Sequence, residues 1–179
     1  IIKYYIMEVM VDTKESQSQN FLLDNWVVWA HLPNNNNWDL SSYIEITTIN
    51  TAEDTCKYVE NFPDILIKNC MLFIMRKGIN PYWEDPQNIK GGCFSYKVSN
   101  KIVVQCWKNL SYLLLGETLT NANISHHING ITISPKKNFC IIKIWLNTCE
   151  YNDINIIQNI SELPIHNGLF KKHVESENF

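Results

Sequence analysis

The sequence predicts an α+β fold, in which helices cover one face of an antiparallel β-sheet. Strand-like segments outnumber helical ones, two of them form a hairpin, and no regular strand–helix–strand alternation appears. The chain has 179 residues, a length that favours one domain with a sizeable core. Its 45% hydrophobic and 18% charged residues are typical of a globular chain.

The strands are predicted from β-branched residues and from alternation of apolar and polar side chains. A buried apolar run ends before Pro33, and the turn "PKKN" joins two strands into a hairpin. The predicted strands cover residues 21–32, 41–49, 70–76, 93–98, 130–135 and 139–146.

Three helices are predicted between these strands. Thr51 followed by Asp54 resembles a capping box and starts a helix of about ten residues that ends before Pro63. Residues 100–119 have apolar side chains at helical spacing, and residues 151–164 have them at 154, 157 and 160. We expect a flexible or loosely packed segment over residues 1–20 and a single domain over residues 21–179.

Charge, cysteines and hydropathy narrow the classes of function. A net charge of -3 and a pI of about 5.9 disfavour a protein that coats long stretches of nucleic acid. The six cysteines show no C-x-x-C pair or metal-ligand spacing, and we interpret them as reduced thiols. No apolar run approaches the roughly 20 residues that span a membrane, and no secretory signal is visible. We therefore expect a monomeric cytoplasmic protein that makes no contact with membranes.

Two of the six tryptophans stand in predicted loops, where core packing does not explain them. Trp38 follows "NNNN", and Trp83 follows "NPY" and precedes Glu84. Two loop tryptophans can enclose a flat ligand, and a positively charged ligand gains a cation–π attraction to each ring. A carboxylate accepts two parallel N–H donors, which the Watson–Crick edge of guanine offers and that of adenine does not.

The chain resembles translation initiation factor 4E, the family that binds the 7-methylguanosine cap of messenger RNA. The resemblance is carried in order by "WVVW", "NNNNW", "INPYWEDPQNIKGG", "LLLGE", "NGITIS" and "IIKIWL", and W-E-D-x-x-N-x-x-G-G is its most specific part. It implies a curved sheet of about eight strands with three helices on its convex face. It also implies that Trp38 and Trp83 stack on the methylated base, that Glu84 binds its edge and that Trp145 contacts the methyl group. Asp85, Asn88 and the glycine pair 91–92 are expected to shape the loop.

The resemblance also implies where the cap phosphates bind. The family's arginine position falls on Lys136, whereas its lysine position falls on Ile141, so one contact is missing. Lys143 shares the face of Ile141, and we predict that Lys136, Lys143 and Lys137 form the phosphate clamp instead. In the tail, Lys171, Lys172 and His173 are candidates for contact with the phosphates or the first transcribed nucleotide.

The chain departs from the family on the predicted partner surface. Cys56 stands where the family has the tryptophan that receives a partner helix, and Lys108 and Tyr112 stand near Trp107 where apolar residues are expected. Loss of an aromatic anchor can cost several kcal/mol. We expect weak binding to a scaffold subunit of the initiation factor 4G type, or a dedicated partner with a different motif.

We therefore expect a cap-binding protein that promotes translation initiation without catalysis, cofactor or metal. The Asn and Ile bias indicates an AT-rich genome and a divergent family member of viral or protist origin. Two alternatives remain open: a translational repressor that sequesters caps, and an interaction module that has lost cap binding. A decapping enzyme is disfavoured, since "CEYNDINIIQNISE" lacks the required spacing of glutamates.

Overall fold

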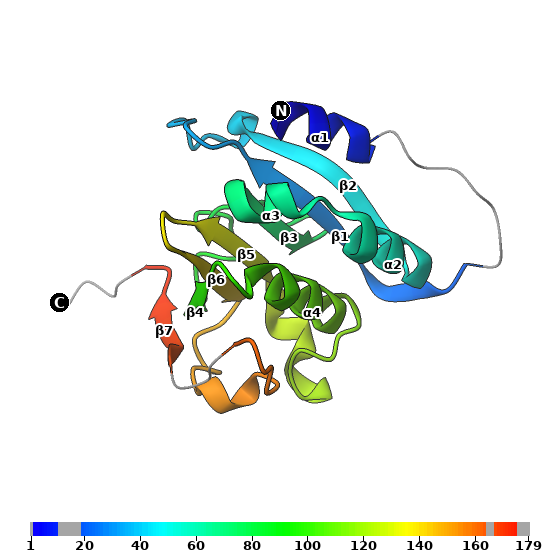
Figure 1. The fold of residues 1–179 in the computed structure, drawn as a ribbon. Coiled ribbons are helices and arrows are strands. Elements are labelled where there is room, and N and C mark those ends of the chain that lie inside the picture. Colours follow the sequence, from blue (N-terminus) through cyan, green and yellow to red (C-terminus); the bar gives the residue numbers. More distant parts are fainter. Residues whose placement is uncertain (1, 11–18, 164–166, 175–179) are drawn as a thin grey trace.

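A seven-stranded antiparallel sheet forms the centre of the molecule (Figure 1). The computed structural model describes residues 2–10, 19–163 and 167–174. Neighbouring strands follow the order β2-β1-β3-β5-β6-β4-β7, and every pair is antiparallel. The strands are β1 (Phe21–His31), β2 (Tyr43–Thr51), β3 (Met71–Arg76), β4 (Gly92–Ser99), β5 (Ile128–Pro135), β6 (Phe139–Leu146) and β7 (Leu169–Lys172).

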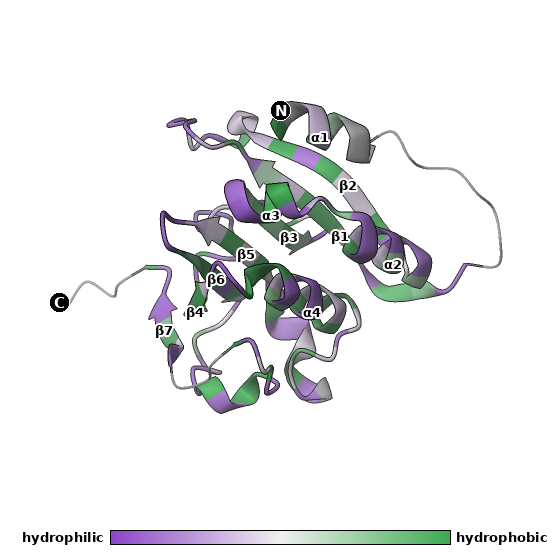
Figure 2. Ribbon diagram, viewed as in Figure 1, coloured by the Kyte–Doolittle hydropathy of each residue, from purple (hydrophilic) through white to green (hydrophobic). Residues whose placement is uncertain are grey.

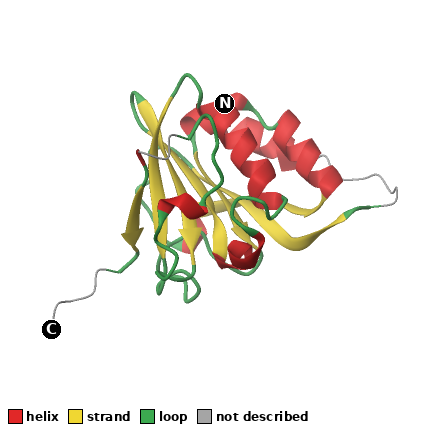
Figure 3. Cartoon of the chain, turned by 90° about the horizontal axis from the view of Figure 1, so that it is seen from below, coloured by secondary structure: helices red, strands yellow, loops and turns green. Residues whose placement is uncertain are grey.

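Helices pack on one face of this sheet, as the view in Figure 3 shows. The α-helices are α1 (Ile2–Met10), α2 (Ala52–Asn61), α3 (Asp64–Asn69) and α4 (Val103–Leu115). None of the helices in the described residues is long and apolar enough to cross a membrane. The predicted α+β class is confirmed, with seven strands where the family resemblance implies about eight.

The capping box predicted at the start of α2 is present. The Thr51 hydroxyl accepts a hydrogen bond from the Asp54 N–H at 3.0 Å, and the Asp54 carboxylate accepts one from the Thr51 N–H at 3.2 Å. Both bonds satisfy N–H groups that have no partner within the helix. Helix α2 therefore begins where the sequence predicts, and its mostly hydrophilic residues appear in Figure 2.

Alternation along the strands separates a large core from a small one. Leu72 and Ile74 of β3 belong to the cluster beneath the helices, whereas Phe73 and Met75 belong to a second cluster on the opposite side. We call that opposite side the site face. Its buried cluster comprises Tyr43, Phe73, Met75, Ile79 and Trp145.

The helix predicted over residues 151–164 is wrong. In the described part of that segment only Ile154–Ile156 is helical, as one 3₁₀ turn. The Gln158 N–H donates to the Leu119 carbonyl at 2.9 Å, and Ile157 forms a bridge with Thr120. Backbone groups that a helix would use internally are thus committed to another segment, and Asn and Ile are weak helix formers.

Residues 2–10 differ from the loosely packed segment that we expect. They form α1, which contacts β2 and α3, and Ile6 is only 2% exposed. Residues 11–18 of the same expected segment lie outside the described residues.

Arg76 connects distant parts of the helix side. Its guanidinium forms ion pairs with Asp24 and Glu117, both at 2.7 Å, and lies 4.5 Å from the centre of the Trp26 ring. It also donates to the carbonyl oxygens of Ile128 at 2.7 Å and Ser125 at 2.9 Å. One side chain thereby holds β1, β5 and the segment after α4 together.

We predict that Arg76→Met lowers the free energy of unfolding by about 3–5 kcal/mol. The Glu117 side chain is only 10% exposed, so the substitution leaves a buried carboxylate without its cation. Urea unfolding followed by circular dichroism measures the change. Lys101→Met, at an exposed turn, is the control and should change stability by less than about 0.5 kcal/mol. A loss below about 1 kcal/mol in Arg76→Met would contradict this role.

Candidate functional site

Stacking on a histidine orients the Trp38 ring on the site face. The Trp38 side chain is 58% exposed, yet its ring stacks on His31 with centroids 4.2 Å apart and planes 3° apart. His31 is 3% exposed and its Nε2 lies 2.8 Å from the Asn37 carbonyl oxygen, which fixes the ring to the loop that carries Trp38. One face of the indole is therefore covered and oriented before any ligand arrives.

Tyr43 lies between the Trp38 loop and the loop of Trp83. Its ring centroid is 5.2 Å from that of His31 and 6.5 Å from that of Tyr82. Burial, followed by the negative charge of Glu84, raises the pKa of Tyr43 to about 12. The effect of Glu84 on Tyr43 indicates that this carboxylate lies within electrostatic range of the Tyr43 hydroxyl.

Trp83 and Glu84 are presented by a loop with its own buried hydrogen bonds. Asp85 is 3% exposed and accepts bonds from the backbone N–H and side-chain amide of Asn80 and from the Gln87 N–H, at 2.8–3.0 Å. Trp83 at the loop surface remains 45% exposed. Asp85 thus shapes the loop, as predicted, and does not form an acid–base pair with Glu84.

Asn88 ties the same loop to the sheet. It is fully buried, donates to the carbonyl oxygens of Asn80 and Tyr82 at 3.1 and 2.8 Å, and accepts from Asn129 of β5 at 2.8 Å. A Cβ atom at Gly91 would overlap the carbonyl oxygen of Leu146, so only glycine fits there. The predicted structural roles of Asn88 and of the glycine pair are confirmed.

Trp145 forms the floor of the site face. Its ring is 5% exposed, and β6 places it between Cys93 of β4 and Gly130 of β5. His173 meets this ring edge-on, with centroids 4.7 Å apart and planes 89° apart. The buried indole N–H of Trp145 has no hydrogen-bond partner among the described residues.

The predicted lysines occupy two places. Lys143 points to the site face, with its ammonium 6.0 Å from the centre of the Trp145 ring. The register of β5 and β6 puts Lys136 at the hairpin tip on the same side, where its N–H donates to the Phe139 carbonyl at 2.8 Å. Lys136 and Lys137 both line a cavity beside this tip.

Strand alternation places the tail residues on two different sides of the sheet. Lys171 pairs with Cys93 across β7 and β4, so Lys171 and His173 lie on the site face. Lys172 alternates to the side of Phe170, which packs on Phe94 beneath the helices. Lys172 therefore lies on the other side of β7 from Lys171 and His173, and a ligand contact of any of the three stays a prediction.

The predicted partner surface also needs a correction. Cys56 is exposed on α2, and the Tyr112 hydroxyl donates to Glu60 at 2.6 Å between α4 and α2, with Lys108 half-buried on α4. Trp107 is 1% exposed and donates to the Tyr58 hydroxyl at 3.2 Å. Trp107 is thus a core residue that cannot offer its ring to a partner.

Sequence reasoning missed His31, Tyr43 and Lys97. Lys97 shares its side of β4 with Cys93, and its ammonium lies 4.3 Å from the centre of the Phe139 ring. Alternation in "CFSYKV" would have placed Lys97 on the site face. No comparable signal marks His31, because its partner Trp38 is brought back by an irregular loop with Asn34 at a φ of 66°.

Comparisons with known proteins assign the chain to a family. The family model described as Eukaryotic initiation factor 4E matches residues 21–177. A mimivirus protein named "Eukaryotic translation initiation factor 4E homolog" is 39% identical over 97 residues, which are 54% of this chain and 35% of that protein. The initiation factor 4E of Candida glabrata is 25% identical over 157 residues, 83% of this chain and 73% of the relative. The chain thus spans about a third of the mimivirus protein's length.

Solved structures share the fold. The eIF4E-3 of Caenorhabditis elegans, in complex with the 4E-binding protein Mextli and a cap analogue, superposes with a TM-score of 0.68 at 19% identity. The match covers 77% of this chain and 80% of the other. A schistosome eIF4E complexed with m7GpppG and 4E-BP superposes with a TM-score of 0.67 at 22% identity, over 75% of this chain and 76% of the other.

We predict that His31→Ala loosens Trp38, whereas His31→Phe retains its order. Phenylalanine preserves a flat ring against the indole, and such a ring pair contributes about 0.5–1.5 kcal/mol. ¹⁵N relaxation of the Trp38 indole N–H measures the change, with the indole of buried Trp107 as internal control. Equal order parameters in the alanine and phenylalanine variants would show that stacking does not position Trp38.

We predict that β7 detaches at mildly acidic pH. Burial lowers the pKa of His173 to about 4. The Gly92 backbone opposes this shift, and the charge of Lys143 adds to it. An unfolded histidine binds a proton below about pH 6.5. The stability of β7 is therefore fully present above that pH and is lost as the pH falls toward 4.

Hydrogen exchange of the β7 amides between pH 7 and 4.5 tests this dependence, after correction for the intrinsic exchange rate. Protection in β7 should fall while that in β6 persists. His173→Phe should remove the difference between the two strands, since phenylalanine does not titrate. Constant β7 protection in the unmodified protein would contradict the prediction.

Proposed function

The chain belongs to the eukaryotic initiation factor 4E family, and on that premise we propose that it binds the 7-methylguanosine cap of messenger RNA and promotes translation initiation. The observation that carries the proposal is the arrangement around Tyr43. On one side an exposed tryptophan is already stacked on His31, and on the other lies the loop of Trp83 and Glu84.

The chemistry of the methylated base suits these groups. Methylation at N7 gives guanine a positive charge, so each tryptophan ring contributes about 0.5–2 kcal/mol through a cation–π attraction. Trp38 and Trp83 are the proposed stacking rings, and Trp145 is the proposed contact for the methyl group. Glu84 would accept hydrogen bonds from N1 and the amino group of guanine, while the backbone N–H of Trp83 would donate to O6.

Lysines on the site face are the proposed phosphate ligands. Lys143 and Lys136 would neutralise the triphosphate, and Lys97 is a further candidate on the neighbouring strand. Each ammonium is a point charge without the two-pronged geometry of arginine. We therefore expect phosphate binding to depend on charge more than on exact orientation.

Lys171 and His173 are the proposed contacts for the first transcribed nucleotide. Their support is the pairing of β7 with β4, which keeps the end of the described chain beside Trp145. Both ring nitrogens of His173 are buried without a hydrogen-bond partner among the described residues, so a ligand group could satisfy them.

The proposed role in the cell is recruitment of capped messenger RNA in the cytoplasm through a scaffold-type partner. Related structures contain 4E-binding proteins, which supports a protein partner for this chain. The family resemblance assigns that partner to α2 and α4. The exposed Cys56 on α2 in place of an aromatic anchor favours a dedicated partner. A repressor that sequesters caps remains the alternative, because it needs the same ligand site and no scaffold.

The decisive experiment is titration of tryptophan fluorescence with 7-methyl-GTP and with GTP. We predict strong quenching by the methylated nucleotide and much weaker binding of GTP. Glu84→Gln replaces one acceptor by a donor while preserving size, and should weaken binding of 7-methyl-GTP by about 1.5–3 kcal/mol, roughly 10- to 100-fold.

Asp39→Asn, which removes an exposed carboxylate near Trp38, is the matched control and should retain affinity within about threefold. Equal and weak responses to both nucleotides in the unmodified protein would refute cap binding. Undiminished affinity in Glu84→Gln would refute the role of the carboxylate alone.

A further inference from the structure

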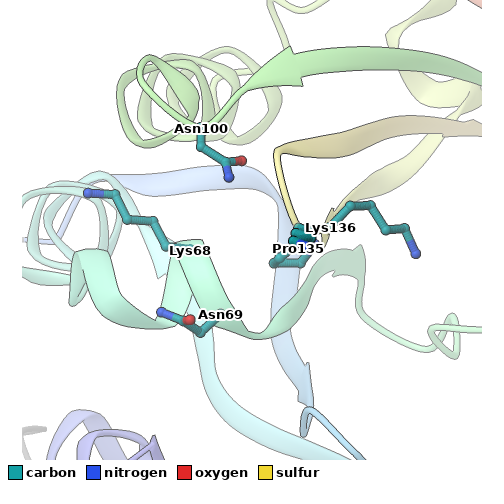
Figure 4. Close-up of a pocket in the computed structure, with 6 residues that line it drawn as sticks. Lys68, Asn69, Asn100, Pro135 and Lys136 are labelled. Carbon is teal, nitrogen blue, oxygen red and sulfur yellow. The ribbon is translucent and has the colours of Figure 1, made fainter.

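A second basic site includes the hairpin-tip lysines of the predicted phosphate clamp and extends from them to α3. A cavity of about 530 Å³ opens where the end of α3, the turn before α4 and the β5–β6 hairpin come together (Figure 4). Its lining consists of Lys68, Asn69, Asn100, Pro135, Lys136 and Lys137. None of the groups described above for the base or the tail nucleotide belongs to it.

Lysines supply the charge of the cavity's lining within the described residues. No acidic side chain lines it, and none of its three lysines forms an ion pair within the described residues. In Figure 4 the side chains of Lys68 and Lys136 extend in opposite directions, with both ammonium groups directed away from the space between α3 and the hairpin. In a protein of net charge -3, such a local excess of positive charge favours an anionic ligand.

A neutral donor completes the lining. The Asn100 side-chain oxygen accepts a bond from the Cys140 thiol at 3.4 Å, which leaves the amide nitrogen available to a ligand. Figure 4 shows this nitrogen directed away from α4 and toward the cavity. Asn69 differs, because its amide nitrogen already donates to the Ile65 carbonyl at 2.8 Å. Ammonium groups together with a neutral N–H donor are the chemistry that a phosphate group requires.

The cavity meets the row of lysines from the proposed cap site at the hairpin tip. Lys136 belongs to both, whereas Lys68 and Asn100 lie on the helix side of the sheet. Along β6, Trp145 and Phe139 are six residues apart, about 20 Å at the rise of a β-strand, and Lys136 lies beside Phe139. Lys143 stands between them on the same side. A cap bound at Trp145 with its phosphates along this row would direct the following nucleotides toward the hairpin tip.

We infer that this cavity binds a backbone phosphate of the RNA that follows the cap, through Lys68, Lys137 and Asn100. The inference rests on the proposed cap-binding function and extends the footprint from the cap to the first nucleotides of the transcript. Lysines on flexible stems bind phosphate without reading sequence, so the contact adds affinity for capped RNA of any sequence.

The test compares ligands of increasing length on the intact chain. Fluorescence titrations use 7-methyl-GTP, m7GpppA, and capped oligoadenylates of increasing length, at several salt concentrations. The variant is Lys68→Ala combined with Lys137→Ala. The matched control is Lys57→Ala combined with Lys108→Ala, which removes the same charge from α2 and α4. Circular dichroism and the thermal midpoint verify that both variants fold.

The expected result is a gain in affinity with RNA length that the cavity variant loses. Its affinity for 7-methyl-GTP should equal that of the unmodified protein, whereas the longer capped RNA should bind roughly three- to tenfold more weakly. The salt dependence of log K for that RNA should become shallower by about 0.7 for each phosphate contact removed. The control variant should retain the full gain.

Each contrary result identifies what fails. No response of the unmodified protein to 7-methyl-GTP would overturn the proposed function and this inference with it. A normal response with no gain from RNA length, or a gain that survives in the cavity variant, would overturn the inference alone. Equal weakening of 7-methyl-GTP and of RNA would assign the lysines to the triphosphate. Binding of a polyglutamate peptide by the unmodified protein but not the variant, without dependence on RNA length, would assign the cavity to an acidic protein segment.

Discussion

The site face depends on the buried side-chain amide of Asn88. It joins a loop without regular secondary structure to β5, with all its bonds made inside the protein. Leaving a buried polar group unsatisfied costs about 1–3 kcal/mol, so this loop has few alternative conformations of similar free energy. The hydrogen bonds of Asn88 thereby fix the position of Trp83 and Glu84.

His31 contributes the same kind of preorganisation on the other side of Tyr43. An exposed indole would ordinarily sample several rotamers, and ordering such a side chain on binding costs roughly 0.5–1.5 kcal/mol. Stacking on the buried His31 ring restricts the rotamers of Trp38 during folding, so less entropy is lost on binding. In both loops, buried residues that form hydrogen bonds thus order an exposed tryptophan ring.

Local interactions explain which elements the sequence predicts. The capping box of α2 needs only Thr51 and Asp54, and each of the six predicted strands is marked within its own residues by β-branched side chains, alternation or an apolar run. By contrast, β7 has four residues and forms only because β4 is beside it, while residues 154–163 fold against Leu119 and Thr120. The same distinction holds at the site: Trp83 stands in a recognisable motif, whereas His31 acquires its role from a loop geometry that no local pattern encodes.

The short strand β7 has a consequence for the behaviour of the protein in solution. Without it, the edge of β4 that β7 leaves unpaired would extend from Tyr96–Ser99 to the whole strand, Gly92–Ser99. Long apolar edges of this kind recruit strands from other molecules and promote aggregation. A four-residue edge carrying two lysines is a poor template for such pairing. Strand β7 therefore shortens the exposed edge of the sheet and lowers the tendency of the protein to aggregate.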